Sequence, residues 1–591
     1  MRSAIEVTHI LTINNSELFR ASKKLFSPYK AHIIVISVTM VLASVGSFAN
    51  PWLTMQLIDV GILGADFRQT TIYVGAIFVI FIIQQLIGAL QFYFYRDISI
   101  KIPYDLNLIV SKHILSMRVK YFKERNFSVV MAEIFQDISN ISALTGTQFL
   151  TSFVTLFRII AGVVALMIIN WQLTLVMVSV IPIKLLISHI LFKKQEAVYK
   201  AIMKFQTDFS AWLSDSISGI VEIKMWNLIN SKLISLASIL EKGNKTKSRL
   251  MFYAYIDNFL GTTLSVMFTC VLYIYGAVLI ADDRMTIGML VSFVAYSALV
   301  FEPVSIVSHI ITQLSTTRPA FSRFLKFMET DVESDKPDAI EMSCSADINS
   351  IVFDNVSLTY ESEYVLSKVT FKINKGERVA IIGLNGSGKS SIINLLLRFY
   401  EPTEGNIEIN GKDISLYTFD SYRSIWSLMA QNCYIFNGSI EENINITQDL
   451  TASDIKECCT KSGASLFVEN LPLKLKTPTG YNGAKLSGGE RQKISLARTL
   501  AKKKSKILVL DEATSSYDYH SEQQFNKEIL ASSQYNITIL VTHRPEILKQ
   551  MDKIIFLEKG VIAGIGTFDE LINSSNNFQT MIEESQKEGE R

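Results

Sequence analysis

Long apolar runs fill the first half of the chain, and short ones fill the second half. A helix needs about 20 apolar residues to cross a hydrocarbon core roughly 30 Å thick, and six runs come close to that length or exceed it. They lie at residues 31–58, 72–96, 146–170, 172–193, 252–281 and 285–313. A minimal turn at Asn170 and Trp171 joins the third run to the fourth, which predicts two antiparallel helices there.

The polar stretches between these runs carry unevenly distributed positive charge. Many lysines and arginines lie between the second and third runs and between the fourth and fifth, whereas the short loops of the other side offer only Arg68 and Arg284. Cytoplasmic loops of membrane proteins are enriched in lysine and arginine. The sequence therefore predicts that both long loops and both termini lie in the cytosol, and that most of these charges only set this topology.

From Ser350 onward, short β-branched runs alternate with helical segments. The runs are SIVFDNVSLTY, ERVAIIGL, KILVLDEA, ITILVTH and KIIFLEKG. This alternation is typical of a parallel sheet covered by helices. The predicted organisation is therefore a cytosolic N-terminal segment at 1–30, a six-helix membrane domain at 31–325, a polar linker at 326–349 and an α/β domain at 350–591.

Composition agrees with a membrane protein and argues against other classes. Apolar residues make up 49% of the chain and charged residues 19%, below the roughly 25% of a soluble protein. A net charge of +2 lacks the basic excess of a sequence-independent nucleic-acid binder, so no nucleic-acid partner is expected. The cysteines are too few and too irregularly spaced for a disulfide framework or a zinc site, and are expected to be reduced. They are Cys270, Cys344, Cys433, Cys458 and Cys459.

A glycine-rich loop follows the apolar strand ERVAII and precedes the helical run SIINLLLRFY. This is the context of a P-loop, in which backbone N–H groups and a helix N-terminus surround phosphates. Lys389 is expected to reach the β- and γ-phosphates, and the Ser390 hydroxyl to ligate Mg²⁺. The predicted ATP-binding residues of this segment are Gly383, Asn385, Gly386, Ser387, Gly388, Lys389, Ser390 and Ser391.

Two carboxylates end the apolar strand ILVLDE, downstream of this loop. Asp511 is suited to hold the magnesium shell, and Glu512 is placed to polarise the attacking water. Phosphoryl transfer depends mainly on positioning and charge neutralisation, so no covalent nucleophile is needed. On its own a strand ending in Asp-Glu would mean little; its place after a P-loop gives it this interpretation.

The segment Leu486-Ser487-Gly488-Gly489-Glu490 resembles the signature of ATP-binding cassette (ABC) proteins. Other elements follow the family's order: Tyr360 resembles the aromatic residue that stacks on adenine, Gln431 the glutamine between cassette and membrane domain, and His543 the switch histidine near the γ-phosphate. Taken singly, a tyrosine, a glutamine and a histidine at these places are usually packing, surface and core residues. The resemblance implies catalytic roles for Glu512 and His543, magnesium ligation by Ser390, Gln431 and Asp511, and nucleotide contacts by Tyr360, Gln431, Ser487, Gly488, Gly489, Glu490 and Asp518.

The resemblance to the exporter branch of the family covers nearly the whole chain. It implies a six-helix exporter-type membrane domain followed by a cytosolic P-loop ATPase domain with a helical subdomain. YFKERNFSVVMAEIFQDISNI and SGIVEIKMWN, in the two cytosolic loops, are similar to the family's helical extensions, whose short helices dock on the cassette near Gln431. In the family, each ATP lies between the P-loop of one chain and the signature of another. One helix set and one cassette therefore imply a half-transporter that dimerises, most simply with itself.

Three positions differ from the usual family pattern. Tyr481 stands where exporters usually have a glutamate ahead of the signature, which puts signalling between cassette and loops in doubt. Tyr517 precedes Asp518 where relatives have small apolar residues, so hydrolysis is expected to be slower than typical. Glu490 replaces a frequent glutamine, and nothing follows from this difference.

The resulting expectation is an ATPase, using ATP and Mg²⁺, that exports a peptide, lipid or drug-like compound across a bacterial cytoplasmic membrane. A gated channel or sensor, an importer built on the same fold and, least favoured, a soluble ATPase are the alternatives. Charged groups inside a membrane usually face a cavity or a partner, so the apolar runs hold candidate substrate contacts, with Gln84 and Gln85 as weaker ones. They are Arg158, Lys184, Glu302 and His309. Headgroup-level or structural pairing is the alternative for Lys184, Glu302 and His309, and Glu302-Pro303 could instead mark a kink.

Overall fold

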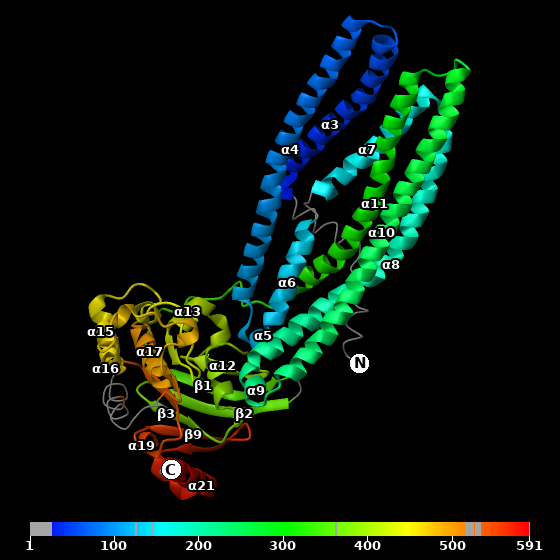
Figure 1. Ribbon diagram of the computed structural model, residues 1–591. Helices are drawn as coiled ribbons and strands as arrows, with labels where there is room; N and C mark the ends of the chain where they lie inside the picture. Colours follow the sequence, from blue (N-terminus) through cyan, green and yellow to red (C-terminus); the bar gives the residue numbers. More distant parts are fainter. Residues whose placement is uncertain are drawn as a thin grey trace. The chain divides into compact units, whose positions relative to one another are not determined.

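The computed structural model describes residues 27–124, 127–143, 147–343, 346–360, 363–513, 525 and 534–589. Within these ranges it leaves undescribed the side chains of 123–124, 128–129, 147–157, 302–312, 314–316 and 585–589. The chain divides into two compact units (Figure 1). We call residues 1–117 and 122–331 the helical unit, and residues 118–121 and 332–591 the sheet unit.

The helical unit contains a helix for each of the six apolar runs. These helices are α3 (Lys30–Gln56), α4 (Phe67–Ser116), α7 (Thr147–Ile169), α8 (Trp171–Ser218), α10 (Ile229–Ala281) and α11 (Ile287–Met328). The 3-10 turn η2 (Ser27–Tyr29) leads into α3, and the π-helical turn η3 (Leu57–Ile62) extends it. Shorter helices are α5 (Val119–Glu124), α6 (Phe127–Ser142) and α9 (Ile220–Met225). Helix α11 continues to Met328, so the first residues of the predicted linker are helical.

Four of the helical segments are long and apolar enough to cross a membrane, each with a mean hydropathy of at least 2.0 in its most apolar window. They are Ser27–Ile62, Phe67–Ser116, Trp171–Ser218 and Ile229–Ala281. Two shorter apolar segments, Arg158–Ile169 and Ile287–Phe301, lie in α7 and α11 next to the undescribed side chains. If all of these segments were buried in the core of a soluble protein, little surface would remain to face water. We therefore infer that the chain is a membrane protein.

Polar residues at the helix ends define the turns between these helices. Asn170 caps α8: its side-chain oxygen accepts hydrogen bonds from the backbone N–H groups of Gln172 and Leu173. Trp171 of the predicted turn already belongs to α8, so the turn is one residue long. Asp59 in η3 accepts hydrogen bonds from the Thr286 hydroxyl and from the backbone N–H of Gly288 at 2.8 Å. This carboxylate therefore ties the end of the first helix to the start of α11.

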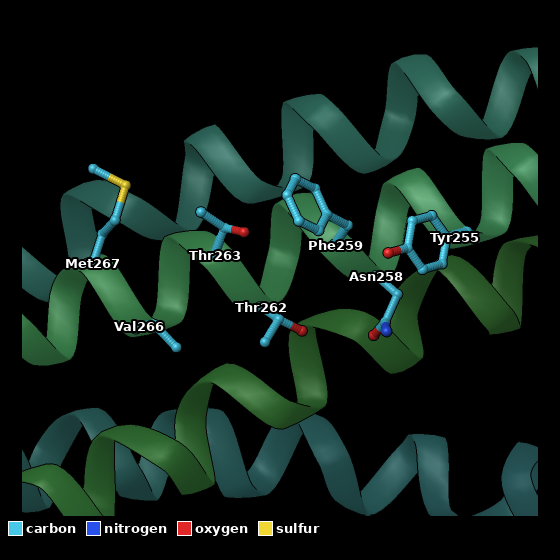
Figure 2. A pocket seen from close by; sticks show the side chains of 7 residues that line it. All are labelled: Tyr255, Asn258, Phe259, Thr262, Thr263, Val266 and Met267. Carbon is cyan, nitrogen blue, oxygen red and sulfur yellow. The ribbon is translucent and has the colours of Figure 1, made fainter.

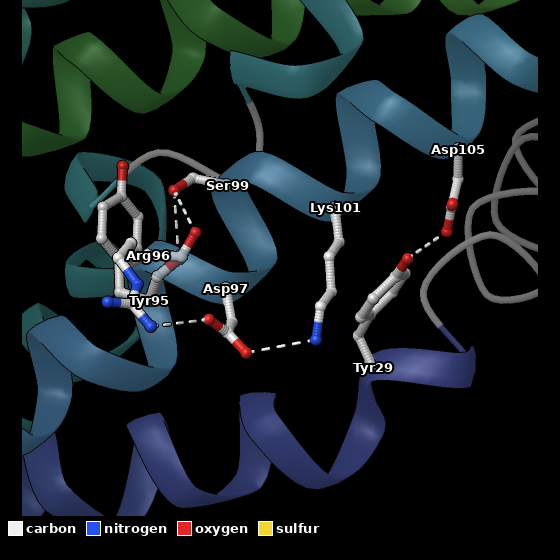
Figure 3. Close-up of polar contacts among 7 residues, drawn as sticks. All are labelled: Tyr29, Tyr95, Arg96, Asp97, Ser99, Lys101 and Asp105. Atoms are coloured by element: carbon white, nitrogen blue, oxygen red, sulfur yellow. Dashed lines mark hydrogen bonds and ion pairs between the residues drawn. The ribbon is translucent and has the colours of Figure 1, made fainter.

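Helix α4 is 50 residues long and continues without a break beyond its apolar part. Charged side chains in the continuation pair with one another, as Figure 3 shows: Asp97 lies 3.2 Å from Arg96 and 3.1 Å from Lys101. The Tyr29 hydroxyl donates to the Asp105 carboxylate and so links η2 to α4. Long polar stretches that read as loops are thus helical extensions, as the family resemblance implied.

The C-terminal end of α11 packs against α6. Arg323 forms a two-pronged ion pair with Asp137, which is almost fully buried. Burial raises the pKa of Asp137 above its usual value even though Arg323 opposes the shift. The Thr317 hydroxyl adds a hydrogen bond of 3.0 Å to the carbonyl of Asn140. These contacts make α6 and the end of α11 one rigid element within the helical unit.

The sheet unit holds two sheets with different strand patterns. A four-stranded antiparallel sheet has the order β2-β1-β4-β5, and a six-stranded sheet has the order β10-β9-β3-β8-β7-β6. The first sheet contains β1 (Ser350–Tyr360), β2 (Glu363–Asn374), β4 (Glu404–Ile409) and β5 (Lys412–Asp413). The second contains β3 (Arg378–Ile382), β6 (Trp426–Met429), β7 (Ile507–Asp511), β8 (Ile537–Val541), β9 (Lys553–Glu558) and β10 (Val561–Gly566).

The assignment of SIVFDNVSLTY to the parallel sheet was wrong. This run is β1, which pairs antiparallel with β2 and with β4. The chain turns back two residues after β1 and forms a hairpin, and no helix intervenes to carry it across a parallel sheet. The other four runs form β3, β7, β8 and β9, which are mutually parallel neighbours.

Helices cover the sheets and form a subdomain between β6 and β7. The helices are α12 (Lys389–Leu396), α13 (Phe419–Ser424), α14 (Ile440–Ile444), α15 (Ala452–Lys461), α16 (Ser465–Val468), α17 (Gly488–Ala501), α19 (Pro545–Leu548), α20 (Phe568–Ser574) and α21 (Asn576–Gly589). Cys458 and Cys459 are buried on α15, and burial raises the pKa of Cys459 to about 12. All four described cysteines are free thiols.

Candidate nucleotide site

The glycine-rich loop joins β3 to α12, as the sequence predicts. Gly388 has a φ of 104°, and a Cβ atom there would approach Leu366 Cδ2 to 2.5 Å. A Cβ atom at Gly383 would collide with the backbone carbonyl of Leu557. Only glycine fits these two positions, so the chain can curl tightly and direct its N–H groups inward. The loop is therefore shaped as a phosphate-binding cradle.

Lys389 opens α12 and lies within the curl of the loop. Its Nζ donates hydrogen bonds to the carbonyl oxygens of Gly383 at 2.6 Å and Leu384 at 3.1 Å. Burial lowers the pKa of Lys389, whereas the carboxylates of Glu512 and Asp511 oppose the shift. The Ser387 hydroxyl is buried and makes no hydrogen bond within the described residues. An orphaned donor beside a buried cation fits a site built to receive an anion.

Four adjacent parallel strands end at the same edge of the six-stranded sheet. Their order is β3, β8, β7 and β6, and each is followed by a different predicted site residue. The glycine loop follows β3, His543 follows β8, Asp511 and Glu512 end β7, and Gln431 follows β6. Ligands of open α/β sheets bind outside the carboxyl ends of the strands. The sheet topology thus gathers groups that lie up to 160 residues apart in the chain.

Asp511 and Glu512 differ in environment although they are neighbours. Burial and the adjacent Glu512 charge raise the pKa of Asp511 to about 6, with Lys389 acting in the opposite direction. Glu512 has a φ of 51°, a backbone conformation that non-glycine residues rarely adopt. Its carboxylate accepts a hydrogen bond of 2.8 Å from the Nε2 of Gln431. The strained turn therefore holds the carboxylate against the glutamine of the next strand.

The donor set at this edge fits Mg²⁺ bound largely through phosphate. Magnesium prefers oxygen ligands and usually takes only one or two of them from carboxylates. The Ser390 hydroxyl and the Asp511 carboxylate supply such oxygens, and the amide oxygen of Gln431 stays available while its nitrogen bonds Glu512. Among the described residues there is no group of three or more His, Cys, Asp or Glu side chains that could enclose a metal.

The remaining predicted nucleotide contacts are placed in part. The ring of Tyr360, at the end of β1, meets the ring of Tyr400 edge to face with centroids 5.1 Å apart. His543 is partly exposed two residues beyond β8. Asp518 lies outside the described residues, as do Ser515, Ser516 and Tyr517.

The signature segment forms the N-terminus of α17. Ser487 is the N-cap, and its hydroxyl accepts a hydrogen bond from the N–H of Glu490 while the Glu490 carboxylate accepts one of 2.7 Å from the N–H of Ser487. This reciprocal capping box is made equally by glutamate or glutamine, which is why the Glu490 difference carries no consequence. Tyr481, in the turn ahead of the signature, is 79% exposed and presents an aromatic surface.

Arg498 anchors the signature helix α17 and was missed by the sequence argument. It lies in the last turn of α17, and its guanidinium donates to the carbonyls of Asn443 at 2.8 Å and Tyr434 at 2.7 Å, and to the Asn443 side chain. Burial lowers its pKa. The contacts join the signature helix to the segment after Gln431. The sequence feature that could have revealed it is an arginine inside the apolar run ISLARTLA. A buried arginine needs hydrogen-bond partners, so such an arginine indicates a local clamp.

Comparison with known proteins agrees with this geometry. The sequence matches the family described as ABC transporter transmembrane region over residues 33–304, and the family described as ABC transporter over residues 366–515. A probable multidrug resistance ABC transporter ATP-binding/permease protein of Bacillus subtilis, YheH, is 30% identical over 80% of this chain and 71% of that protein. The chain belongs to the ABC transporter family.

Further relatives of this ABC transporter are named for flipping and export, and a solved exporter structure shares its fold. An ATP-dependent lipid A-core flippase of Albidiferax ferrireducens is 25% identical over 97% of the chain and 99% of its own length. A β-(1→2)glucan export ATP-binding/permease protein of Bartonella quintana, NdvA, is 27% identical over 80% and 79%. A structure described as a bacterial Atm1-family ABC exporter with ATP bound superposes with a TM-score of 0.83 at 22% identity, over 93% of this chain and 98% of that one.

These findings confirm the predicted fold class and the predicted ATP-hydrolysing transporter activity. An exporter-type helical membrane region precedes an ABC ATPase domain that binds ATP. Neither the channel nor the importer alternative is favoured by relatives named for export, resistance and flipping.

Two of the four candidate substrate contacts of this ABC transporter are described, and both have protein partners. Arg158 Nε, on α7, donates to the Ser44 hydroxyl of α3 at 3.1 Å. Lys184, on α8, is only 5% exposed, and its Nζ donates to the carbonyl of Phe301 on α11 at 3.0 Å. Glu302 and His309 lie on α11, but their side chains are outside the described residues.

Proposed function

We propose that this ABC transporter is a half-transporter that uses ATP hydrolysis to export a peptide, lipid or drug-like compound by alternating access in a dimer. The observation that carries the proposal is the convergence of four strand ends on one edge, where Gln431 Nε2 lies 2.8 Å from the Glu512 carboxylate. Gln431 lies between β6 and the helical subdomain. Movements of that subdomain can therefore change its hydrogen bond to the catalytic carboxylate of Glu512. Exporter relatives support the direction of transport.

We assign the chemical roles as follows. The N–H groups of the glycine loop and the Lys389 ammonium bind the β- and γ-phosphates, which neutralises charge that grows in the transition state. Glu512 orients and polarises the attacking water, and His543 contacts the γ-phosphate. Tyr360 stacks on the adenine. Mg²⁺, held through Ser390, Asp511 and Gln431, supplies further charge neutralisation at the transferred phosphoryl group.

The signature segment is assigned to a second chain's nucleotide. In this proposal Ser487, Gly488 and Gly489 contact the γ-phosphate bound by the P-loop of the partner, with Asp518 at the seam, and the partner is a second copy of this chain. A helix N-terminus favours negative charge, and α17 begins directly at these glycines. One helix set and one ATPase domain per chain support this arrangement, because a two-fold axis then completes both sites.

The proposed location is a bacterial cytoplasmic membrane, with both termini and the sheet unit in the cytosol. The distribution of lysine and arginine supports this orientation. The bacterial relatives are consistent with the location. Lipid surrounds the apolar helices in this arrangement. Arg158, Lys184, Glu302 and His309 remain proposed contributors to a polar chamber.

The test is ATPase activity of the purified chain in lipid nanodiscs, comparing wild type with Glu512→Gln. Glu469→Gln, an exposed glutamate of the helical subdomain, is the matched control. We expect hydrolysis to fall at least about 100-fold in Glu512→Gln and to stay within twofold in Glu469→Gln. Equal hydrolysis by wild type and Glu512→Gln would refute the assignment of the catalytic carboxylate.

Transport itself is tested in proteoliposomes with labelled lipid, drug and peptide panels. ATP-dependent movement away from the side that bears the ATPase domain supports export, and movement toward that side would establish an importer. Single-channel current gated by ATP would establish a channel. A wild-type chain that hydrolyses no ATP alone, but does so with a second half-transporter, would replace the homodimer by a heterodimer.

A further inference from the structure

A hollow of about 390 Å³ lies beside α10 (Figure 2). Tyr255, Phe259 and Met267 are among the residues that line it. It belongs to the helical unit, in which the polar chamber is already proposed, so it adds nothing beyond transport. The linker after α11 has no assigned role, and its contacts within the sheet unit are more informative.

The second half of the linker docks along α13 and the turn before it. We call residues 333–342 the strap. The backbone N–H of Ile340 donates to the carbonyl of Leu416 at 2.9 Å. Asp335 accepts a hydrogen bond of 2.8 Å from the N–H of Phe419, the first residue of α13. The N-cap residue of this helix makes no capping bond through its own side chain, so the strap supplies the missing cap.

A two-pronged ion pair holds the start of the strap. The guanidinium of Arg423, on α13, donates to the two carboxylate oxygens of Glu333 at 2.6 and 2.8 Å. The side chain of Glu333 is 18% exposed and that of Arg423 28%, so water screens this pair less than a pair on the open surface. The rings of Phe399 and Phe419 each lie 5.0 Å from the guanidinium carbon. The paired bonds and the rings together fix the orientation of the guanidinium.

Arg423 also caps α12, the helix that follows the glycine loop. The last carbonyl groups of a helix have no partner within it. Arg423 Nε donates to the carbonyl of Leu397 at 3.2 Å, and its Nη2 donates to the carbonyl of Arg398 at 3.0 Å. The neighbouring Tyr422 hydroxyl donates to the carbonyl of Leu396 at 2.5 Å. One side chain therefore bonds both the strap and the C-terminal end of α12.

The turn after α12 is strained. Arg398 has a φ of 54°, a backbone conformation that persists in non-glycine residues only where the surroundings enforce it. Its buried guanidinium donates to the carbonyl of Tyr417 at 2.6 Å. Helix α12 has eight residues and begins with Lys389, so only about 12 Å separate this turn from the glycine loop. A shift of the turn should therefore displace the loop.

We propose that Glu333 and Arg423 are positioning residues of the nucleotide site. The docked strap orients Arg423, Arg423 holds the C-terminal end of α12, and α12 keeps the glycine loop in the shape that binds phosphates. Undocking of the strap weakens the binding of ATP. The strap begins five residues after α11 ends at Met328, so the helical unit can act on ATP affinity through the chain itself. This role concerns ATP binding alone and holds whichever compound is transported.

Binding of AMP-PNP, a non-hydrolysable ATP analogue, to the full-length transporter in nanodiscs with Mg²⁺ tests this role. Glu333→Gln keeps the size of the side chain but removes its charge, and we expect about fivefold weaker binding. Glu333→Asp keeps the charge and should recover part of the loss. Asp347→Asn, which removes an exposed ion pair between another linker carboxylate and Lys375, is the matched control and should bind within about twofold of wild type.

A double variant shows whether Glu333 acts through Arg423. Arg423→Gln loses the contacts with both the strap and α12, so AMP-PNP should bind about tenfold more weakly or worse. Adding Glu333→Gln to it should weaken binding no further, because residues that act in one chain of contacts are not additive.

Hydrogen exchange of the strap separates a positioning role from a purely structural one. Two linked equilibria change each other by the same factor, so saturating AMP-PNP should slow amide exchange in residues 333–342 of the wild type about fivefold. In Arg423→Gln, saturating nucleotide should leave this exchange unchanged. An ion pair that only stabilises the fold would lower the melting temperature of Glu333→Gln without making the exchange depend on nucleotide.

Three results would overturn the proposal. They are AMP-PNP binding by Glu333→Gln within about twofold of wild type, strap exchange in the wild type that does not respond to nucleotide, and a double variant that binds more weakly than Arg423→Gln. If Glu333→Gln does not fold, exchange in the wild type alone decides. Neither measurement involves hydrolysis or transport, so a failure of the proposed export function leaves both tests intact.

Discussion

Two buried lysines, one in each unit, have similar immediate contacts but different surroundings. Lys389 is 9% exposed and bonds the carbonyls of Gly383 and Leu384, while Lys184 is 5% exposed and bonds the carbonyl of Phe301. Lys389 lies in a loop whose glycines leave room, and two carboxylates act on it. Lys184 lies among three helices, and Asp257 is the one charged group among the described residues that acts on it electrostatically. Burial and a carbonyl contact alone therefore do not reveal whether a lysine is placed to bind phosphate.

The largest effect is expected from removing the lysine of the sheet unit. Lys389→Met deletes the charge that stabilises the phosphates, so ATPase activity should fall at least about 100-fold with little change in thermal stability. Lys412→Met, at an exposed position of β5, is the control and should keep activity within twofold. An active Lys389→Met variant would break the distinction between the two lysines.

The lysine of the helical unit is expected to affect stability instead. Lys184→Met removes the buried donor that bonds the carbonyl of Phe301, and leaving that buried carbonyl without its partner costs about 1–3 kcal/mol, so the melting temperature should drop by several degrees. Basal ATPase activity should stay within threefold at a temperature where the variant is folded. Lys200→Met, which removes an exposed ion pair on the same helix, should leave the melting temperature unchanged within 1 °C.

A second substitution separates packing from a substrate contact at Lys184. Lys184→Gln keeps a neutral donor for the carbonyl of Phe301, so it should recover most of the lost stability. If Lys184→Gln stays as unstable as Lys184→Met while substrate-stimulated ATPase disappears in both, Lys184 belongs to the transport chamber, and the comparison of the two lysines must be redrawn.

The sequence predicted the two units to different extents, because different features determine where their side chains lie. In the sheet unit, Asp511, Glu512 and the glycine loop were predictable, because each follows a strand and parallel strands bring their ends together. The bond between Gln431 and Glu512, and the clamp made by Arg498, depend on side-chain positions that no spacing encodes. The hairpin of β1 and β2 was missed because a two-residue turn gives little signal.

In the helical unit, the apolar runs predicted six helices but not how each helix is rotated. A lone charge in an apolar run can face a chamber, a neighbouring helix or the membrane boundary, and Lys184 faces its neighbours.

The hydrogen bond between Gln431 and Glu512 allows a sharper test of whether these two residues of the sheet unit act together in hydrolysis. Gln431→Glu replaces the hydrogen bond of 2.8 Å by two neighbouring carboxylates, so ATPase activity should drop by tens of fold. Gln550→Glu, where an exposed glutamine bonds its own helix turn, is the matched control. Activity near wild type in Gln431→Glu would mean that the contact positions nothing needed for hydrolysis.

Protons should compete with Mg²⁺ for the Asp511 carboxylate, and the Mg²⁺ requirement should change by about tenfold, which is a smaller effect. Its pKa of about 6 is raised by burial and by Glu512, so this carboxylate is ionised above pH 6 and becomes neutral as the pH falls below it. The Mg²⁺ concentration that half-saturates nucleotide binding should therefore rise about tenfold between pH 7 and pH 5. Glu512→Gln removes one cause of the raised pKa, and in it the rise should begin at lower pH. An identical profile in both proteins would contradict this coupling.

The smallest effect is expected at Glu490, where the chain departs from a common family residue. Its carboxylate caps the N–H of Ser487 at 2.7 Å, and a glutamine amide oxygen can accept the same bond. Glu490→Gln should therefore leave the ATPase activity within twofold of wild type and the melting temperature within 1 °C of it. Glu490→Ala removes the acceptor and should destabilise α17 by about 1 kcal/mol. If Glu490→Gln alone lowers activity strongly, the glutamate charge itself acts at the signature, and the capping explanation is insufficient.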